Sequence, residues 1–136
     1  MNPSVEREPI VAWLRERLPE LEAVYLFGSA VRGPWRPDSD LDLAIDAGRP
    51  LEPAVRYELA LELGVAMNRD VDLIDMQRAN AVLRREILTT GERLYVRDRA
   101  RQDALEAAML TEYLDFAFIR QKHLEAILAD GQVYGR

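Results

Sequence analysis

The sequence predicts an α+β fold in which a small mixed sheet is flanked by helices and followed by a long C-terminal helix. Three observations predict it: short apolar runs of strand length, stretches of helical spacing between them, and a final helical pattern over about 101–129. With 136 residues, the chain fits a single domain over 1–136 that is large enough to bury a core. No repeat, low-complexity tract or linker divides the sequence.

Apolar periodicity predicts the first elements. Apolar residues at helical spacing are Ile10, Trp13, Leu14 and Leu18. Because Pro9 is acceptable in the first turn, these residues predict a helix that runs to about Pro19. The apolar run 24–27 predicts a strand. In the turn-rich loop 28–39 that follows, a short helix is expected to begin at Ser29.

The later elements alternate in the same way. They are a strand at 41–45, a helix at 53–67, a strand at 71–74, a helix at 79–88 and a short strand at 94–96. The Gly-Arg-Pro sequence at 48–50 is expected to end the strand at 41–45. Gly91 suits the C-terminal turn of the helix at 79–88.

Two carboxylates alternate along the strand predicted at 41–45. In extended chain, the side chains of Asp40 and Asp42 point to the same side and lie roughly 6.5 to 7 Å apart, while Leu41 and Leu43 face the opposite layer. Magnesium prefers oxygen ligands and usually takes one or two carboxylates, with water and substrate phosphate as its other ligands. Asp40 and Asp42 are therefore predicted to bind Mg²⁺.

Gly28 and Ser29 are predicted to bind the triphosphate of a nucleotide. A glycine without a Cβ lets the backbone approach a phosphate, and free N–H groups at a strand-to-helix turn form an anion cradle. The Ser29 hydroxyl adds a donor. The pair precedes Asp40 and Asp42 at a spacing that predicts a nucleotidyl-transfer site.

A third carboxylate is expected if the site holds two metals, because one metal activates the attacking oxygen while the other holds the phosphates. The run 71–74 is the other short apolar run with alternating acids, and Asp72 in its middle is the candidate. Asp70 and Asp75 are expected to be solvated charges at the ends of that strand.

Four motifs carry a resemblance to a known family: GSAVRG, PDSDLDLAI, DVDLID and VLRREILTTGERLY. Through them, residues 24–96 resemble the minimal nucleotidyltransferases of the DNA polymerase β superfamily, in particular MntA-type adenylyltransferase antitoxins encoded beside HEPN-domain toxins. The resemblance implies a polymerase-β-like fold. It also implies that Asp40 and Asp42 are metal ligands, that Asp72 is the third catalytic acid, and that Gly28 and Ser29 bind triphosphate.

The resemblance further implies a reaction in which AMP passes from ATP to a tyrosine hydroxyl of a partner HEPN ribonuclease, which is thereby neutralised. Arg32 and Arg36 are candidates to bind the leaving pyrophosphate, and surface salt bridges are the simpler alternative for both. Two other functions stay open. One is an antitoxin that blocks its partner sterically without catalysis. The other is a nucleotidyltransferase for small molecules such as aminoglycosides, which normally needs an additional substrate-binding domain.

Composition and charge exclude several classes of function. The net charge of −6, from 18 basic and 24 acidic residues, argues against direct binding of nucleic acid. Without cysteine the chain has no disulfide, thiolate metal site or cysteine nucleophile. A single histidine, His123, leaves no zinc pair, and Pro34 and Trp35 stand where a P-loop needs Lys and Ser or Thr. No apolar segment approaches the roughly 20 residues of a membrane helix and no signal peptide is apparent, so a cytoplasmic protein is expected.

The C-terminal helix has more apolar side chains than one buried face needs. One stripe consists of Leu110, Leu114, Ala117 and Phe118, and an adjacent flank consists of Leu105, Met109, Phe116 and Ile119. One stripe is expected to cover the sheet. The second set of apolar side chains indicates either a docking surface for a protein partner or a helix that is buried on more than one face.

Overall fold

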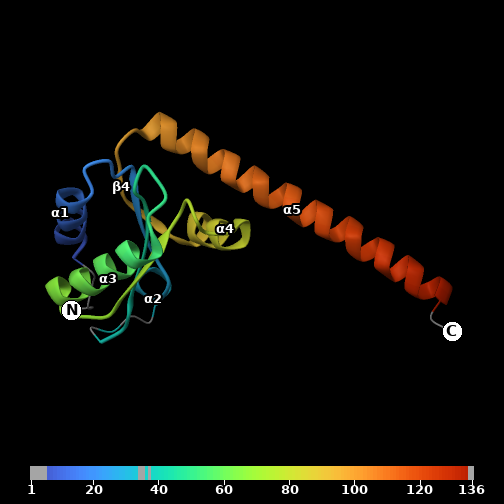
Figure 1. Cartoon of the computed structure of the whole chain (residues 1–136), viewed down its shortest axis with the longest axis horizontal. Coiled ribbons are helices and arrows are strands. Elements are labelled where there is room, and N and C mark those ends of the chain that lie inside the picture. The colour runs from blue at the N-terminus through green and yellow to red at the C-terminus, as the bar shows by residue number, and fades with distance from the viewer. Residues whose placement is uncertain (1–5, 34–35, 37, 135–136) are drawn as a thin grey trace.

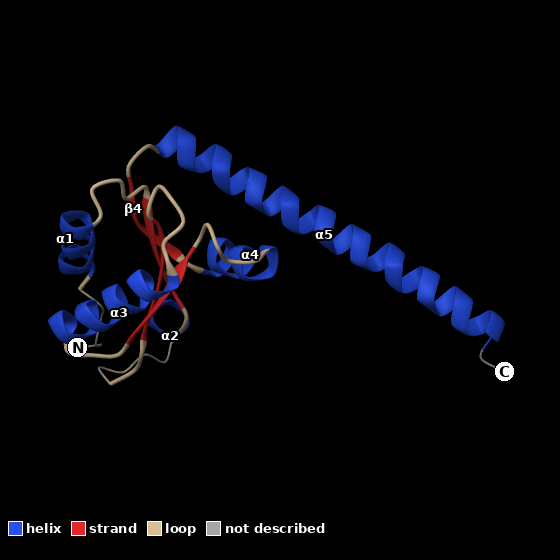
Figure 2. Cartoon of the chain, viewed as in Figure 1, coloured by secondary structure: helices blue, strands red, loops and turns tan. Residues whose placement is uncertain are grey.

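A mixed four-stranded sheet lies at the centre of the part of the chain that the computed structural model describes, residues 6–33, 36 and 38–134. The elements are α1 (Arg7–Arg17), β1 (Ala23–Phe27), α2 (Ser29–Arg32), β2 (Leu41–Asp46), α3 (Pro53–Met67), β3 (Val71–Asp75), α4 (Ala81–Thr90), β4 (Glu92–Val96) and α5 (Arg99–Tyr134). Figures 1 and 2 show helices on both sides of the sheet and α5 extending far beyond it. The predicted mixed sheet and long C-terminal helix are confirmed.

The strand order is β3-β2-β1-β4, and β2 and β3 are parallel while the other two pairs are antiparallel. In this order β1 and β3 flank β2 on opposite sides. The register sets Phe27 of β1 opposite Asp42 of β2, and Asp42 opposite Asp72 of β3. The residues predicted to form the site are thus brought to one end of three adjacent strands.

Alternation along the strands produces two apolar layers. On one face Leu41, Leu43 and Leu73 pack with residues of α1 and α3. On the other face Tyr25 and Ala44 pack with residues of α4 and the first turns of α5. Because the odd-numbered leucines of β2 fill the first layer, the side chain of Asp42 lies on the α4 and α5 face.

Local chemistry moves several boundaries from their predicted positions. Helix α4 begins at Ala81, two residues later than predicted, because the Asn80 side chain accepts a hydrogen bond from the Leu83 N–H at 2.8 Å and caps the helix. Helix α1 ends at Arg17, before the predicted limit at Pro19. β4 begins two residues earlier than predicted, and α5 is longer than predicted at both ends.

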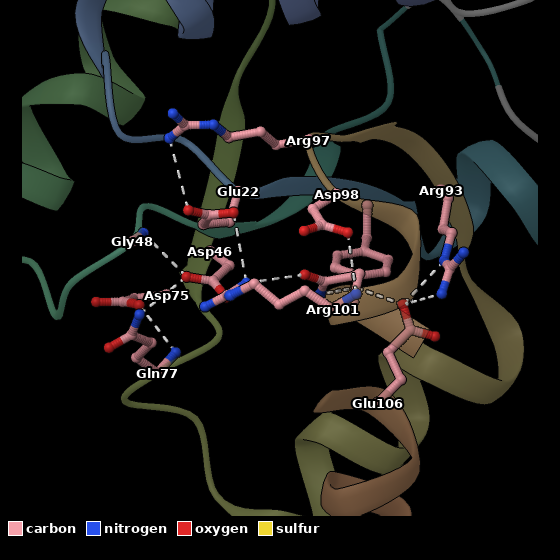
Figure 3. Close-up of polar contacts among 12 residues, drawn as sticks. Glu22, Asp46, Gly48, Asp75, Gln77, Arg93, Arg97, Asp98, Arg101 and Glu106 are labelled. Atoms are coloured by element: carbon pink, nitrogen blue, oxygen red, sulfur yellow. Dashed lines mark hydrogen bonds and ion pairs between the residues drawn. The ribbon is translucent and has the colours of Figure 1, made fainter. Parts of the chain in front are cut away.

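The first turns of α5 are fixed to the sheet by a partly buried polar network (Figure 3). The Tyr25 hydroxyl on β1 donates to the Glu106 carboxylate and accepts from Gln102 Nε2, both at 2.6 Å. Arg93 of β4 pairs with Glu106 and with Asp103, at 2.8 and 2.6 Å. Burial, followed by the hydrogen bond to Glu106, raises the pKa of Tyr25, so the phenol stays a neutral donor.

Beyond these turns, α5 leaves the body of the protein (Figure 1). Leu105 and Met109 are covered, whereas Leu114, Phe116, Phe118 and Ile119 are exposed. The expectation that one whole stripe covers the sheet is wrong, and so is the alternative of a deeply buried helix. Burial instead changes along α5: apolar side chains near its start are covered and those further along are exposed, because the helix is longer than the domain is wide. None of the helices that the structure describes is apolar and long enough to cross a membrane.

Candidate active site

Three aspartates lie at one end of the parallel strands β2 and β3. Asp42 and Asp72 occupy paired positions on the two strands, whose backbones run roughly 4.8 Å apart. Asp40 immediately precedes β2, where the Leu41 N–H donates to the Asp70 carbonyl at 2.8 Å and holds the two strand ends together. The Asp42 side chain is half-buried, while Asp40 and Asp72 are exposed. Asp40, Asp42 and Asp72 therefore lie at the same end of β2 and β3.

The electrostatics of Asp42 fit a cation site. Burial raises the pKa of Asp42 above its usual value of 3.8, and the negative charges of Asp72 and Asp40 raise it further. Like charges held this close repel one another, and a bound divalent cation would relieve the repulsion. Among the described residues no group of three or more His, Cys, Asp or Glu side chains is arranged to hold a metal ion. Magnesium does not require one, because it takes water and substrate phosphate as further ligands.

Gly28 brings the predicted phosphate cradle into contact with this acid. Its φ of 74° lies in the region that favours glycine, and a Cβ at this position would stand 2.2 Å from Asp42 Oδ2. The Gly28 carbonyl accepts hydrogen bonds from Val31 and Arg32 and so starts the turn of α2. The N–H groups at the start of this turn lack intrahelical partners, as at any helix start, and lie beside Asp42. The arrangement can hold a phosphate between Gly28, Ser29 and the acids.

Of the two arginines predicted at the pyrophosphate, Arg32 has a side-chain partner in this structure. The Arg32 guanidinium on α2 lies 3.2 Å from Glu86 of α4, in an exposed ion pair. Arg36 belongs to a turn in which its N–H donates to Ser39 Oγ at 3.1 Å and its carbonyl accepts from the Ser39 N–H at 2.9 Å. Phosphate binding by Arg32 and Arg36 stays a prediction.

The expectation of a solvated strand-end charge holds for Asp70, which is exposed, and is wrong for Asp75. Asp75 is 3% exposed and accepts hydrogen bonds from the Leu51 and Gln77 N–H groups at 2.8 and 3.0 Å. The carboxylate satisfies backbone donors where the chain leaves β3, because buried N–H groups need partners. Asp75 is a structural residue on the opposite end of β3 from the site.

Sequence reasoning missed a second buried acid, Asp46, at the far end of β2. Its Oδ1 accepts from the Gly48 N–H and from Gln77 Nε2, both at 2.9 Å, and Arg101 of α5 lies 4.0 Å from its Oδ2 (Figure 3). Arg101 also approaches Glu22 at 3.4 Å. Asp46 continues the alternation of Asp40 and Asp42 on the same face, which was the available signal. Through its contact with Arg101, Asp46 links β2 to the first turns of α5.

Comparison with known proteins gives a family match over most of the chain. The family model described as "Polymerase beta, Nucleotidyltransferase" matches residues 8–100. The curated protein adenylyltransferase MntA of Shewanella oneidensis is 40% identical over 86 residues, which are 63% of this chain and 62% of that protein. The alignment thus spans less than two thirds of that relative.

Solved structures resemble a larger part of the chain. A structure described as a toxin–antitoxin with AMP-PNP is 30% identical, covers 94% of this chain and 99% of its own, and has a TM-score of 0.74. A structure described as tri-AMPylated Shewanella oneidensis HEPN toxin in complex with MNT antitoxin is 29% identical, with coverages of 90% and 95% and a TM-score of 0.74. The similarity extends into α5, beyond the residues that the family model matches.

Proposed function

The chain belongs to the polymerase β nucleotidyltransferase family, and from this premise we propose that it is a metal-dependent protein adenylyltransferase. It transfers AMP from ATP to a hydroxyl of a HEPN-domain toxin and so acts as an antitoxin. The acceptor is a tyrosine, and the reaction runs in the cytoplasm.

One observation carries the proposal: Asp42 on β2 is in close contact with Gly28 of the predicted phosphate cradle and is paired with Asp72, the predicted third acid, on β3. Gly28, at the end of β1, leaves no room for a Cβ beside Asp42, and burial, followed by the charge of Asp72 on β3, raises the pKa of Asp42. Nucleotidyl transfer needs these three parts together, because charge must be stabilised on both the leaving and the attacking oxygen.

The reaction forms one phosphorus–oxygen bond and breaks another. The acceptor hydroxyl oxygen attacks the α-phosphorus of ATP, the bond to the bridging oxygen breaks in line, and pyrophosphate leaves. The backbone at Gly28 and the Ser29 hydroxyl hold the triphosphate, and Asp72 accepts the hydroxyl proton. Mg²⁺, which Asp40, Asp42 and Asp72 would hold, supplies the positive charge that stabilises the phosphate oxygens.

The distal part of α5 is the proposed docking surface for the toxin. Phe116, Phe118 and Ile119 are 46%, 61% and 65% exposed on a helix segment that packs against little else. Soluble proteins rarely expose clustered apolar side chains of this size unless they bind a partner. Two similar solved structures are described as toxin–antitoxin complexes, which supports a toxin as the occupant.

Intact-mass measurement of the toxin tests the proposal. Toxin incubated with this protein, ATP and Mg²⁺ is expected to gain the mass of one or more AMP groups, and peptide mapping should place them on tyrosine. An unchanged toxin mass under conditions where the two proteins form a complex contradicts it. That result would favour the second candidate, a sterically acting antitoxin, for which the exposed apolar part of α5 is sufficient.

A further inference from the structure

An ion pair joins α2, the short helix that follows Gly28, to α4. The Glu86 carboxylate of α4 lies 3.2 Å from the guanidinium of Arg32, the last residue of α2. The Arg32 N–H donates to the Gly28 carbonyl at 3.0 Å, so Arg32 and Gly28 belong to the same turn. Because Gly28 is in close contact with Asp42, a contact at Arg32 bears on the geometry of the predicted site.

Helix α2 has few other means of keeping its position. It consists of four residues, none of them buried, although Ala30 is packed against the core, and no side-chain hydrogen bond caps its start. A helix this short gains little from its own hydrogen bonds, because forming the first turn costs more conformational entropy than one bond returns. Its orientation therefore depends on contacts with the rest of the protein.

Helix α4, by contrast, is firmly held. Ile87, which follows Glu86, is fully buried. The Asn80 side chain caps the start of the helix, and at its end the Gly91 N–H donates to the Ile87 carbonyl at 2.8 Å. Because α4 packs on the face of the sheet where the Asp42 side chain lies, Glu86 is presented to α2 from a fixed support on the side of the acids.

On the basis of the proposed function, we propose that Glu86 is a positioning residue for triphosphate binding, which acts through Arg32 and touches no substrate. The ion pair fixes the turn at Gly28, so that the N–H groups at the start of α2 are in place before the nucleotide arrives. Binding then does not have to order this turn, and the entropy of ordering is not subtracted from the affinity. Arg32 thereby acts as an anchor of α2, in place of binding the leaving pyrophosphate.

Glu86→Gln tests the positioning role. It is expected to weaken affinity for a non-hydrolysable ATP analogue with Mg²⁺ about three- to fivefold, the order that a single exposed ion pair contributes. The melting temperature without nucleotide should stay unchanged, because both partners are exposed. A residue that only stabilised the fold would show the opposite pattern.

Glu62→Gln is the matched control. Glu62 of α3 forms a similar exposed ion pair, with Arg17 of α1 at 3.8 Å, on the opposite face of the sheet from the Asp42 side chain. Its loss should change neither the affinity for the analogue nor the melting temperature. An equal loss of affinity in Glu62→Gln and Glu86→Gln would overturn a specific role for Glu86.

Double variants separate an anchor from a phosphate ligand. Arg32→Gln should lose as much affinity as Glu86→Gln, and the two together no more than either, because each breaks the same contact. The charge swap Arg32→Glu with Glu86→Arg should restore most of the affinity. A larger loss in Arg32→Gln that the swap fails to restore would make Arg32 a phosphate ligand and overturn the proposal. Tighter binding in Glu86→Gln would overturn it too, because Glu86 would then compete for Arg32.

These titrations use the nucleotide analogue alone, so they separate the inference from the proposed function. If the wild type binds the analogue and Glu86→Gln binds it equally well, the positioning role is wrong and the proposed function stands. If the wild type does not bind the analogue, the proposed function is overturned, and the positioning role with it.

Discussion

Gly28 and Asp42 are in such close contact that position 28 has no room for a side chain, since an added Cβ would lie 2.2 Å from Asp42 Oδ2. The contact joins the end of β1 to β2. Any change at either position therefore acts on both the phosphate cradle and the acids.

Gly28→Ala is expected to abolish binding of an ATP analogue and to destabilise the protein by about 1–3 kcal/mol, the usual cost of a strained backbone conformation. Gly48→Ala is the matched control, because Gly48 also has a positive φ, of 86°, and a Cβ there would meet the Glu20 carbonyl, away from the acids. It should lower the melting temperature and preserve nucleotide binding. Calorimetry and fluorescence titration measure the two effects. Equal loss of binding in both variants would contradict a local role for Gly28.

Asp42→Asn is expected to abolish AMP transfer without destabilising the protein at neutral pH. The pKa of Asp42 is raised above 3.8 by burial and by the neighbouring acids, so its ionised form disfavours the folded state. The protonated Asp42 carboxyl favours the folded state. Its contribution to the free energy of unfolding is therefore present at low pH and is lost as the pH rises through the folded-state pKa of Asp42. The advantage of the Asn variant should therefore grow between acidic and neutral pH in urea unfolding. A large loss of stability in Asp42→Asn at neutral pH would show that this carboxylate has a structural role.

Magnesium with a non-hydrolysable ATP analogue should raise the melting temperature. A ligand at ~100 times its dissociation constant that binds only the folded protein adds roughly 2.7 kcal/mol to the free energy of unfolding. Chelation of the metal, or Asp42→Asn, should remove most of the increment. A shift that survives chelation would show that the nucleotide binds without the metal.

Phe116→Glu and Ile119→Glu are expected to weaken the complex with the toxin at least about tenfold while the fold stays intact, because both side chains are exposed in the free protein. Met109→Glu is the contrasting variant, since Met109 is 7% exposed and a charge there should destabilise the protein itself. Titration calorimetry and thermal melting separate the two outcomes. Asp40→Asn should bind the toxin as tightly as wild type but fail to protect cells from it, whereas a steric antitoxin would still protect.

Tyr25→Phe is expected to loosen the base of α5. The variant leaves the buried Gln102 amide and the Glu106 carboxylate without the shared hydroxyl, at a cost of about 1–3 kcal/mol. Hydrogen exchange should rise in the first turns of α5 and stay unchanged in β2. The double variant Tyr25→Phe with Gln102→Leu should recover part of the loss, because one unpaired buried group is removed. No recovery would indicate that packing of the ring, and not the hydroxyl, fixes the helix.

The sequence was sufficient to predict the strands and the placement of Asp42 and Asp72 on neighbouring strands, because both follow from alternation along short apolar runs. It was insufficient for Asp75, whose role depends on the Leu51 N–H, brought close only by the folded chain. The start of α4 depends on the Asn80 cap, which competes with the apolar periodicity that suggested an earlier start. The division of α5 into a covered base and an exposed end depends on the width of the domain, which periodicity does not encode.

Helix α5 spans 36 residues, roughly 54 Å, and the polar network around Tyr25 fixes only its first turns. The proposed docking surface and the predicted acids are thereby placed on parts of the molecule that share no side chain. Substitutions at sites this far apart combine almost additively. If the proposed docking surface binds the toxin, a lineage can change which toxin it recognises, one exposed residue of α5 at a time, while the acids of β2 and β3 remain unchanged. Such a protein can adapt its binding to a partner whose sequence changes and still keep its enzymatic activity.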